Sequence, residues 1–272
     1  MYLLTCDDTR NWWGVDVVSG RRGVLFYQSA LQFDTRDDLP RENGVWDLGS
    51  AEAAEMAKLA ETTYRDVNIG LANQFARFSA TVGIDVFQVI EACNSQPFSH
   101  IHQPGIAVGG HCIPVYPLLY LWNDPEATVV QAAREANKAM PSYAAAQLEA
   151  AHGSLVGQRV VVLGAAYRGG VKESALSGVF PLMSSLLARG ANVAVHDPLY
   201  SDNELRAMAL EPYSMGQPAD AVVVQADHVG YGCISAKDIP GVRTVVDGRR
   251  VLNEDAWDVG AFVVLGRARP HV

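Results

Sequence analysis

The stretch Pro104–Pro117 holds the residues best suited to covalent chemistry. It reads PGIAVGGHCIPVYP, with one cysteine, Cys112, close behind Gly105, Gly109 and Gly110. Glycine lacks a Cβ, so the backbone there can approach a ligand closely, and the prolines that follow stiffen the exit from the loop. A thiol presented in this way can act as a nucleophile. A cysteine that merely packs in a core is the plain alternative, and the loop by itself does not decide between them.

A second stretch, Leu163–Gly170, has the character of a phosphate-binding turn. It reads LGAAYRGG after a β-branched run, and Tyr167, Arg168 and the nearby Lys172 add stacking area and positive charge. The stretch lacks the GxGxxG fingerprint of dinucleotide sites, although a helix N-terminus after it can hold a phosphate. Surface solubility is the alternative explanation for each of the three side chains.

Composition narrows the class of protein. The 272 residues carry a net charge of −9, which argues against general nucleic-acid binding because that function needs a basic face. The four cysteines form no CxxC pair, so neither a disulfide framework nor a zinc site is indicated. No signal peptide or apolar run of transmembrane length is evident, which makes the cytoplasm the default compartment and a membrane no expected partner.

A metal site is the alternative use of this region. Three histidines, His100, His102 and His111, lie in or beside the glycine-rich stretch. No carboxylate or cysteine stands around them at ligand spacing, so no metal is predicted.

The elements that position these residues begin at Ser50. Residues 1–49 show no sustained period and receive no fold assignment, apart from a possible short buried piece at Gly23–Tyr27. Ser50 is a candidate N-cap for a long helix that Gly83 ends. Its apolar residues recur every three or four positions and form one face: Met56, Leu59, Thr63, Val67, Leu71, Phe75 and Phe78. Lys58, Thr62, Arg65 and Ile69 lie on a different face.

Further helices are expected before and after the cysteine loop. Asp85 can cap a short helix over Val86–Cys93. Asp124, followed by Pro125, is a candidate N-cap for an alanine-rich helix that extends to about His152. Pro141 predicts a kink or break in that helix, and its alanine content is typical of close packing, including packing between subunits.

From Leu155 onward the pattern changes to short β-branched runs that alternate with helical segments. Such runs are typical of a parallel sheet covered on both faces, and right-handed crossovers make a doubly wound α/β domain the simplest topology. The expected strands are Arg159–Leu163, Asn192–His196, Ala221–Gln225, Arg243–Val246 and Ala261–Leu265, with a helix at Ser177–Arg189. The predicted domains are a helical one, 50–153, and a Rossmann-like one, 154–272.

Several motifs, in order along the chain, resemble the nucleotide-sugar dehydrogenase family, which comprises the UDP-glucose, GDP-mannose and UDP-N-acetylmannosamine dehydrogenases. They are YRDVNIGLAN (64–73), GID (83–85), EACNSQPF (91–98), PGIAVGGHCIP (104–114), LGAAYRGGVKES (163–174), HDP (196–198) and VVDGR (245–249). The resemblance covers about Ser50 to the C-terminus. GGHCIP and YRGGVKE are most similar to the UDP-N-acetylmannosamine branch.

The resemblance implies the four-electron oxidation of a sugar CH₂OH group to a carboxylate by two NAD⁺. The cysteine, here Cys112, attacks the intermediate aldehyde, and the thioester formed after a second hydride transfer is hydrolysed. Lys58 faces the developing oxyanion. The resemblance also implies a homodimer formed through the helical domain, with UDP-sugar as substrate. The substrate-binding candidates are Gly105, Val108, Gly109, Gly110, Tyr167, Arg168, Lys172 and Arg249.

Three departures from the family pattern qualify this interpretation. Thr62 stands where the family has asparagine four residues after the lysine, so Thr62 is the third catalytic candidate. Tyr116 stands where the family has aspartate four residues after the cysteine. Residues 1–49 contain no GxGxxG fingerprint of an NAD-binding domain. The sequence therefore predicts either a truncated dehydrogenase, or a module that binds UDP-sugar and dimerises without oxidising it.

Overall fold

The computed structural model describes residues 2–6, 11–15, 24–26 and 45–267. The chain divides into two compact units, one formed by Met1–Arg65 with His111–Val130 and the other by Asp66–Gly110 with Gln131–Val272. Two long helices, α1 (Ala51–Val82) and α4 (Thr128–His152), contribute residues to both units.

The described part of the first unit contains two strand pairs, and helical segments accompany them. Strand β1 (Tyr2–Cys6) pairs antiparallel with β2 (Asn11–Val15), and β3 (Val24–Phe26) pairs antiparallel with β4 (Val45–Asp47). The short piece expected at Gly23–Tyr27 includes β3, but its two end residues and its burial lie outside what the structure describes. The helical segments include the first part of α1 and α3 (Tyr116–Asn123).

The start and end of α1 agree with its sequence signals. Ser50 Oγ accepts the Ala53 amide at 3.1 Å, which is the capping contact expected of an N-cap serine. The helix ends one residue before Gly83, whose φ of +80° favours glycine. Asp85 likewise caps α2 (Val86–Asn94), with its carboxylate accepting the Phe87 amide at 2.8 Å.

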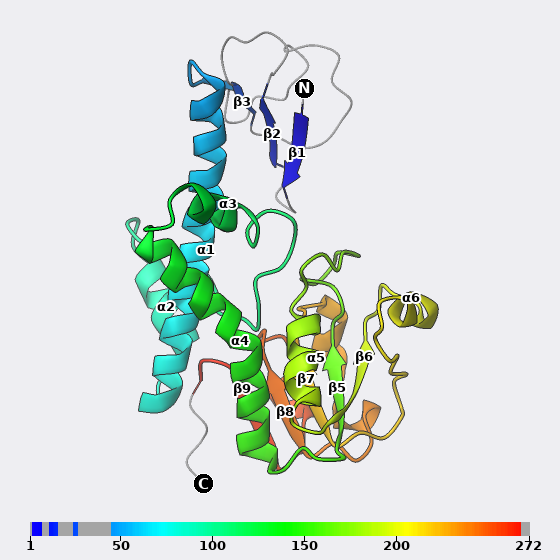
Figure 1. Cartoon of the computed structure of the whole chain (residues 1–272). Coiled ribbons are helices and arrows are strands. Elements are labelled where there is room, and N and C mark those ends of the chain that lie inside the picture. The colour runs from blue at the N-terminus through cyan, green and yellow to red at the C-terminus, as the bar shows by residue number, and fades with distance from the viewer. Residues whose placement is uncertain (1, 7–10, 16–23, 27–44, 268–272) are drawn as a thin grey trace. The chain divides into compact units, whose positions relative to one another are not determined.

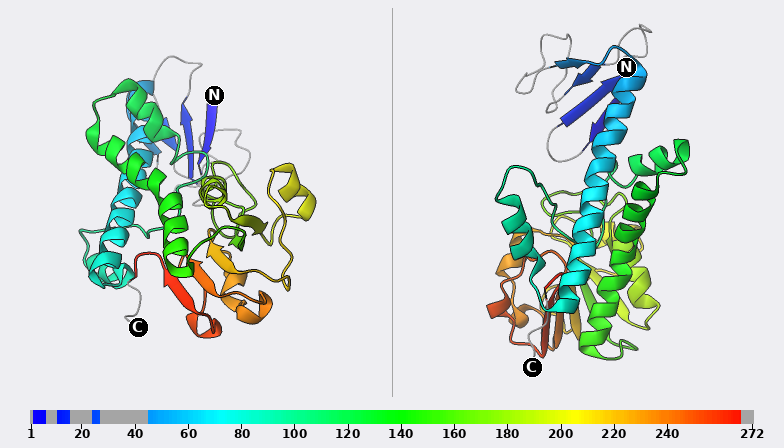
Figure 2. Two further views of the ribbon diagram at one scale, coloured as in Figure 1. Left: turned by 60° about the horizontal axis from the view of Figure 1, so that its bottom comes forward. Right: turned by 90° about the vertical axis from the view of Figure 1, so that its left-hand side faces the viewer.

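The expected apolar face of α1 is largely exposed in the second unit. Leu71, Phe75 and Phe78 are 47%, 36% and 62% exposed. The buried side of this half of the helix instead carries small and polar residues, among them Ala72, Asn73 and Ala76. Gly70 allows this close packing, because a Cβ there would lie 3.0 Å from the backbone of Ala133 in α4. The two helices lie side by side (Figure 2).

The predicted start of α4 was wrong, and the helix is not broken at Pro141. The helix begins at Thr128 instead of directly after Asp124, because Asp124 ends α3, a helix that the sequence analysis did not predict. The Asp124 carboxylate accepts the Glu126 amide at 3.3 Å within the intervening turn. The helix also continues through Pro141 without a break. Gly153 ends it, as expected, with φ of +91°.

The second unit is built on a five-stranded parallel sheet, which confirms the predicted fold class (Figure 1). The strands lie in the order β6-β5-β7-β8-β9. Their bounds are β5 Arg159–Leu163, β6 Asn192–His196, β7 Ala221–Val224, β8 Thr244–Asp247 and β9 Ala261–Val264. Helix α5 (Val179–Leu187) joins β5 to β6, and α6 (Asp202–Ala207) follows β6.

The two faces of the sheet are covered by different elements. Alternate side chains of β5, such as Val160 and Val162, pack in one core with Leu148 of α4 and Leu182 of α5. The side chains between them pack in a second core with Tyr231. Short 3₁₀ helices lie on this second face in place of the α-helices of a doubly wound fold: η2 Val229–Cys233, η3 Ala236–Asp238 and η4 Glu254–Ala256. Among the described residues, no helix is long and apolar enough to cross a membrane.

Candidate functional site

The carboxyl ends of the strands define the first candidate site. The connection from β5 leads to β6 on one side, and the connection from β7 leads to β8 on the opposite side. The switch point of the sheet therefore lies between the adjacent strands β5 and β7. Ligands of open parallel sheets bind outside the carboxyl ends at such a switch point. The loops that follow β5, β7 and β8 begin at this edge, and they carry four of the predicted binding residues: Tyr167, Arg168, Lys172 and Arg249.

Arg249 lies where three loops of this unit meet. Its Nε donates to the Gln225 carbonyl at 2.8 Å, and one terminal nitrogen donates to the Tyr167 carbonyl at 3.3 Å. The other terminal nitrogen lies against Gly105, where an added Cβ would approach it to 2.6 Å. The glycine is therefore needed to let the loop backbone approach the guanidinium.

The charges around Arg249 are balanced within the unit. Burial lowers the pKa of the Arg249 guanidinium, and the carboxylates of Asp227 and Asp247 oppose that change. For Asp227, burial alone would raise the pKa, but the Gly169 amide and the charges of Arg249 and Arg168 hold it below its usual value. The arginine thus remains a cation at a partly buried position, which suits a phosphate ligand.

The glycine-rich loop contacts the turn after β5. A Cβ at Gly109 would lie 2.5 Å from Tyr167 Cβ, and one at Gly110 would lie 3.3 Å from the Tyr167 ring. The Gly110 amide also donates to the Ala175 carbonyl at 2.8 Å. The structure therefore brings Gly105, Gly109 and Gly110 together with Tyr167 and Arg249. Val108 lies half-buried in the same loop.

The two remaining cations differ in their surroundings. Arg168 is half-buried, and its guanidinium lies 3.4 Å from the Gly169 carbonyl oxygen. Lys172 is exposed and donates to Glu204 of α6 at 2.5 Å, with its ammonium 5.3 Å from the centre of the Tyr200 ring. A phosphate that used Lys172 would have to compete with Glu204.

A buried chain of polar side chains holds the Gly105 end of the loop. The Gly105 amide donates to Asn73 Oδ1 at 2.9 Å, and Asn73 Nδ2 donates to Asn137 Oδ1 at 2.9 Å. Asn137 Nδ2 in turn donates to Asp66 Oδ1 at 2.8 Å, and Asp66 pairs with Arg134 Nε at 3.2 Å. Asp66 is fully buried, and burial raises its pKa to about 6 although Arg134 and Asn137 act to lower it.

The second candidate site lies in the first unit, around Lys58. This lysine is only 3% exposed. Its Nζ lies 3.4 Å from a carboxylate oxygen of Glu61 and 5.5 Å from the centre of the Tyr116 ring. Cys112, 4% exposed, accepts the Tyr116 amide on its carbonyl at 2.9 Å. The turn that starts α3 therefore links the thiol residue to the aromatic ring beside the lysine.

Thr62 is placed differently from what its candidate role suggests. It is fully buried, and its hydroxyl donates to the Lys58 carbonyl at 2.8 Å. Hydroxyl groups of helical threonines often bond the carbonyl four residues earlier. The proton of Thr62 is therefore engaged with its own helix, and only its oxygen lone pairs remain for another donor.

Sequence reasoning overlooked several polar residues of these sites. Glu61 stands one turn after Lys58, a spacing that puts both on neighbouring positions of one helix surface. Asp227 and His228 lie just beyond the predicted strand Ala221–Gln225, after Ala226. The carboxyl end of a parallel strand is a signal for functional residues. Asn137 carries no such signal, because only the packing of α4 on α1 brings it to Asn73.

A five-stranded parallel sheet with a half-buried arginine at its switch point defines an open α/β domain, a class in which ligands bind at the carboxyl ends of the strands. Two sequence models of the UDP-glucose/GDP-mannose dehydrogenase family match the chain, the central domain over residues 52–139 and the UDP binding domain over residues 161–254. The chain belongs to this family.

Individual relatives agree with this assignment. A UDP-N-acetyl-D-mannosamine dehydrogenase from Methanocaldococcus jannaschii is 33% identical over 223 residues, which are 80% of this chain and 52% of that protein. The solved UDP-D-ManNAc dehydrogenase from Pyrococcus horikoshii is 31% identical, with a TM-score of 0.67 over 80% of this chain and 53% of that one. A UDP-glucose dehydrogenase from Pyrobaculum islandicum, 24% identical, shares the fold with a TM-score of 0.72 over 81% of this chain and 52% of that one. The chain spans about half the length of the curated relatives it matches.

The turn after β5 does not fit the pyrophosphate of NAD. A dinucleotide turn offers free backbone amides to the phosphates. Here the amides of Gly164, Ala165, Ala166, Tyr167, Gly169 and Gly170 all donate to acceptors within the unit. We therefore derive no step through NAD from the residues that the structure describes.

The buried Asp66 leads us to predict that the unfolding free energy depends on pH. Its pKa is raised from 3.8 to about 6 in the folded chain, so the folded state binds a proton more tightly than the unfolded state does. The stabilisation is fully present below pH 4 and is lost as pH rises through about 6. The change corresponds to about 3 kcal/mol of unfolding free energy. In urea unfolding, the free energy of the wild type relative to Asp66→Asn should increase as pH falls from 7 to 4.

The variant Arg134→Gln tests whether the pKa of Asp66 causes this pH dependence. Removing the cation that lowers the Asp66 pKa should move the pH-dependent range to higher pH. A difference between wild type and Asp66→Asn that stays constant from pH 4 to 7 would contradict the prediction.

Proposed function

We propose that this chain carries the sugar-nucleotide-binding and thiol residues of an NAD-dependent UDP-sugar 6-dehydrogenase of the UDP-N-acetylmannosamine type. The observation that carries the proposal is the position of Arg249, at the switch point of the domain that the UDP-binding family model matches. The diphosphate is bound by Arg249 and Arg168, with Tyr167 beside them. The names of the UDP-N-acetylmannosamine dehydrogenases among its relatives support the choice of sugar.

In this proposal the glycine loop binds the sugar. Its backbone is held close to Arg249 at Gly105 and to Tyr167 at Gly109 and Gly110. Only His111 separates Gly110 from Cys112 in the sequence. Val108 completes the same loop and provides an apolar contact.

Cys112 is the proposed nucleophile. Its sulfur attacks the carbonyl carbon of a sugar aldehyde, a C–S bond forms, and the π electron pair moves to the oxygen. The oxygen carries negative charge until it receives the thiol proton, which completes a thiohemiacetal with no change in net charge. The ammonium of Lys58 stabilises this oxyanion, since a fixed cation at a buried position interacts strongly with charge that develops there. Thr62 offers its oxygen lone pairs on the next turn of α1.

The cofactor proposed from the family is NAD, which supplies hydride acceptance when bound. The residues derived above bind and orient the sugar nucleotide and hold the thiol. The turn after β5 is not proposed as the NAD site, because its Ala165 and Ala166 amides already donate to Asp197.

A second candidate function is a module that binds UDP-sugar and dimerises without oxidation. Two observations favour it. Tyr116 occupies the loop position where the family resemblance leads us to expect a carboxylate, and the Thr62 hydroxyl donates to its own helix.

We further propose that a second copy of the chain covers the exposed stripe of α1. The stripe consists of Leu71, Phe75, Phe78 and Val82, which are 36–62% exposed and recur every three or four residues. A helix with such a continuous apolar face is normally packed against another element.

UDP binding tests the role of the sheet domain. Calorimetry with the full chain should detect UDP, and Arg249→Gln should weaken binding about tenfold or more, since charge-assisted hydrogen bonds to phosphate contribute strongly. Arg243→Gln is the matched control, because this exposed arginine lies just before β8 and pairs with Asp220 at 3.2 Å. A wild-type chain that binds no UDP would refute both candidate functions.

The same preparation separates the two candidates. NADH formed from NAD⁺ and UDP-N-acetylmannosamine, and lost in Cys112→Ala, supports the dehydrogenase. UDP binding without NADH formation supports the module.

Lys58 should control the reactivity of Cys112. A neighbouring cation favours the thiolate, which is the reactive form, so Lys58→Met should slow iodoacetamide labelling of Cys112 about tenfold at neutral pH. Peptide mass spectrometry would measure labelling of Cys112 separately from the exposed Cys233. Lys138→Met, at an exposed position of α4, is the control. Equal labelling rates in Lys58→Met and wild type would argue against an activated thiol.

The proposed dimer makes its own prediction. Light scattering after size exclusion should give twice the chain mass for the wild type. Phe78→Glu should shift it to the monomer, because a carboxylate would be buried in the interface. Phe180→Glu, on the exposed side of α5, should leave the mass unchanged. A dimeric Phe78→Glu protein would place the interface elsewhere.

A further inference from the structure

The turn after β5 is fixed by side chains from the loops that follow the neighbouring strands β6 and β7. Ala165 and Ala166 donate their amides to one carboxylate oxygen of Asp197, at 2.8 and 2.9 Å. The Gly169 amide donates to Asp227 at 2.8 Å, and the Gly170 amide donates to His228 Nδ1 at 3.2 Å. With these amides engaged, a bound phosphate has to be held mainly by side chains that the turn presents.

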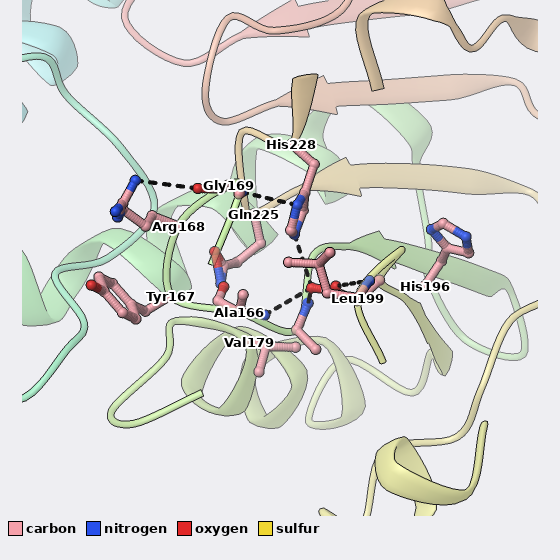
Figure 3. A network of polar contacts seen from close by, with 12 residues as sticks. Ala166, Tyr167, Arg168, Gly169, Val179, His196, Leu199, Gln225 and His228 are labelled. Carbon is pink, nitrogen blue, oxygen red and sulfur yellow. Dashed lines mark hydrogen bonds and ion pairs between the residues drawn. The ribbon is translucent and has the colours of Figure 1, made fainter. Parts of the chain in front are cut away.

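His228 bonds both Asp197 and the Gly170 amide, and so connects the first part of the turn to its last part. Its Nε2 donates to Asp197 at 3.0 Å, while its Nδ1 accepts the Gly170 amide. One ring nitrogen is thus a donor and the other an acceptor, which defines the neutral Nε2–H tautomer. Figure 3 shows the ring between Gly169, on one side, and Ala166 and Leu199, on the other.

The surroundings of His228 leave its ring little freedom. The side chain is 3% exposed, and Tyr231 meets it edge-on at a centroid distance of 5.4 Å. Asp197 accepts a further amide, that of Leu199, at 2.9 Å. Burial would raise the pKa of Asp197, but the bonds from His228 and these amides hold it below its usual value. Asp197 is therefore a firm anchor for the ring.

The turn that His228 holds also positions the arginine side chains that are proposed to bind the phosphate. Arg168 lies next to Gly169, and the Tyr167 carbonyl accepts from Arg249. A turn released at Gly170 would change the position of Arg168, and the contact between Gly169 and Asp227 would loosen with it. No room exists for a compensating shift at Gly169, where even a Cβ would lie 2.1 Å from the Asp227 carbonyl oxygen.

We propose that His228 is a positioning residue for the UDP diphosphate. It acts through Arg168 by bridging Asp197 and the Gly170 amide as a neutral imidazole. This inference rests on the proposed binding of UDP-sugar by the same unit. It assigns to Asp197, Asp227 and His228 the task of shaping a turn whose phosphate contacts come from side chains.

A pair of substitutions separates the two hydrogen bonds of His228. In His228→Asn the amide oxygen can replace Nδ1 as the acceptor for Gly170, but nothing reaches Asp197. In His228→Gln the amide nitrogen can replace Nε2 as the donor to Asp197, but the acceptor for Gly170 is lost. His196→Asn is the matched control, because that ring bonds Tyr231 at 3.2 Å instead of the turn.

The decisive experiment is a double-mutant cycle with UDP as the probe, measured by calorimetry on the full chain. His228→Gln and Arg168→Gln should each weaken UDP binding about tenfold, and the double variant should also lose about tenfold, because residues that act through one another are not additive. His196→Asn should bind UDP as the wild type does. A hundredfold loss in the double variant, or an unchanged affinity in either single variant, would overturn the proposal.

Nitrogen NMR provides a readout that general stability would not change. The ring of His228 should show a protonated Nε2 and an unprotonated Nδ1, and the Gly170 amide signal should shift in His228→Gln but less in His228→Asn. A ring protonated on Nδ1 would also overturn the proposal. If the wild type binds UDP and Arg249→Gln weakens it while His228→Gln does not, only the role of His228 fails and the proposed function stands.

Discussion

The structure of the sheet domain depends on the environment of one guanidinium. Arg249 is bonded to carbonyls of the loops after β5 and β7 and lies against the backbone of Gly105. Three loops far apart in the sequence are thereby fixed relative to one positive charge. Burial of that charge is tolerated because Asp227 and Asp247 lie near it. The glycines of the loop are a geometric consequence, since side chains at these positions would displace the cation or the Tyr167 ring.

Local sequence patterns predicted the framework of this unit well. Near-continuous β-branched runs such as Arg159–Leu163 gave strand bounds that agree with the structure, because a strand buried on both faces needs apolar residues at every position. The N-caps at Ser50 and Asp85 were also predicted correctly. The start of α4 was predicted wrongly, because Asp124 ends the preceding helix α3. An aspartate can stand at either end of a helix.

The periodicity of α1 illustrates what a pattern leaves open. It placed the apolar residues on one side of the helix, yet in the second unit much of that side is exposed while Asn73 and Asp66 are buried. Periodicity shows that apolar residues share a face but does not show which element covers that face. The site residues show the same limit. Cys112, Lys58 and Arg249 stand in recognisable motifs, whereas Asn137 and His228 matter through contacts 71 and 58 residues away in the chain.

The buried chain from Asp66 to Gly105 also has a direction. An ionised carboxylate can only accept, so Asn137 must turn its amide nitrogen toward Asp66 and its oxygen toward Asn73. Asn73 is then forced to present its own oxygen to Gly105. The other end of the chain of bonds requires the same direction, because the Gly105 amide can only donate. The Asp66 backbone carbonyl, which accepts Asn137 Nδ2 at 3.0 Å, can only accept. Two backbone groups therefore fix which way both amide side chains face, and this direction does not depend on the charge of the Asp66 carboxyl.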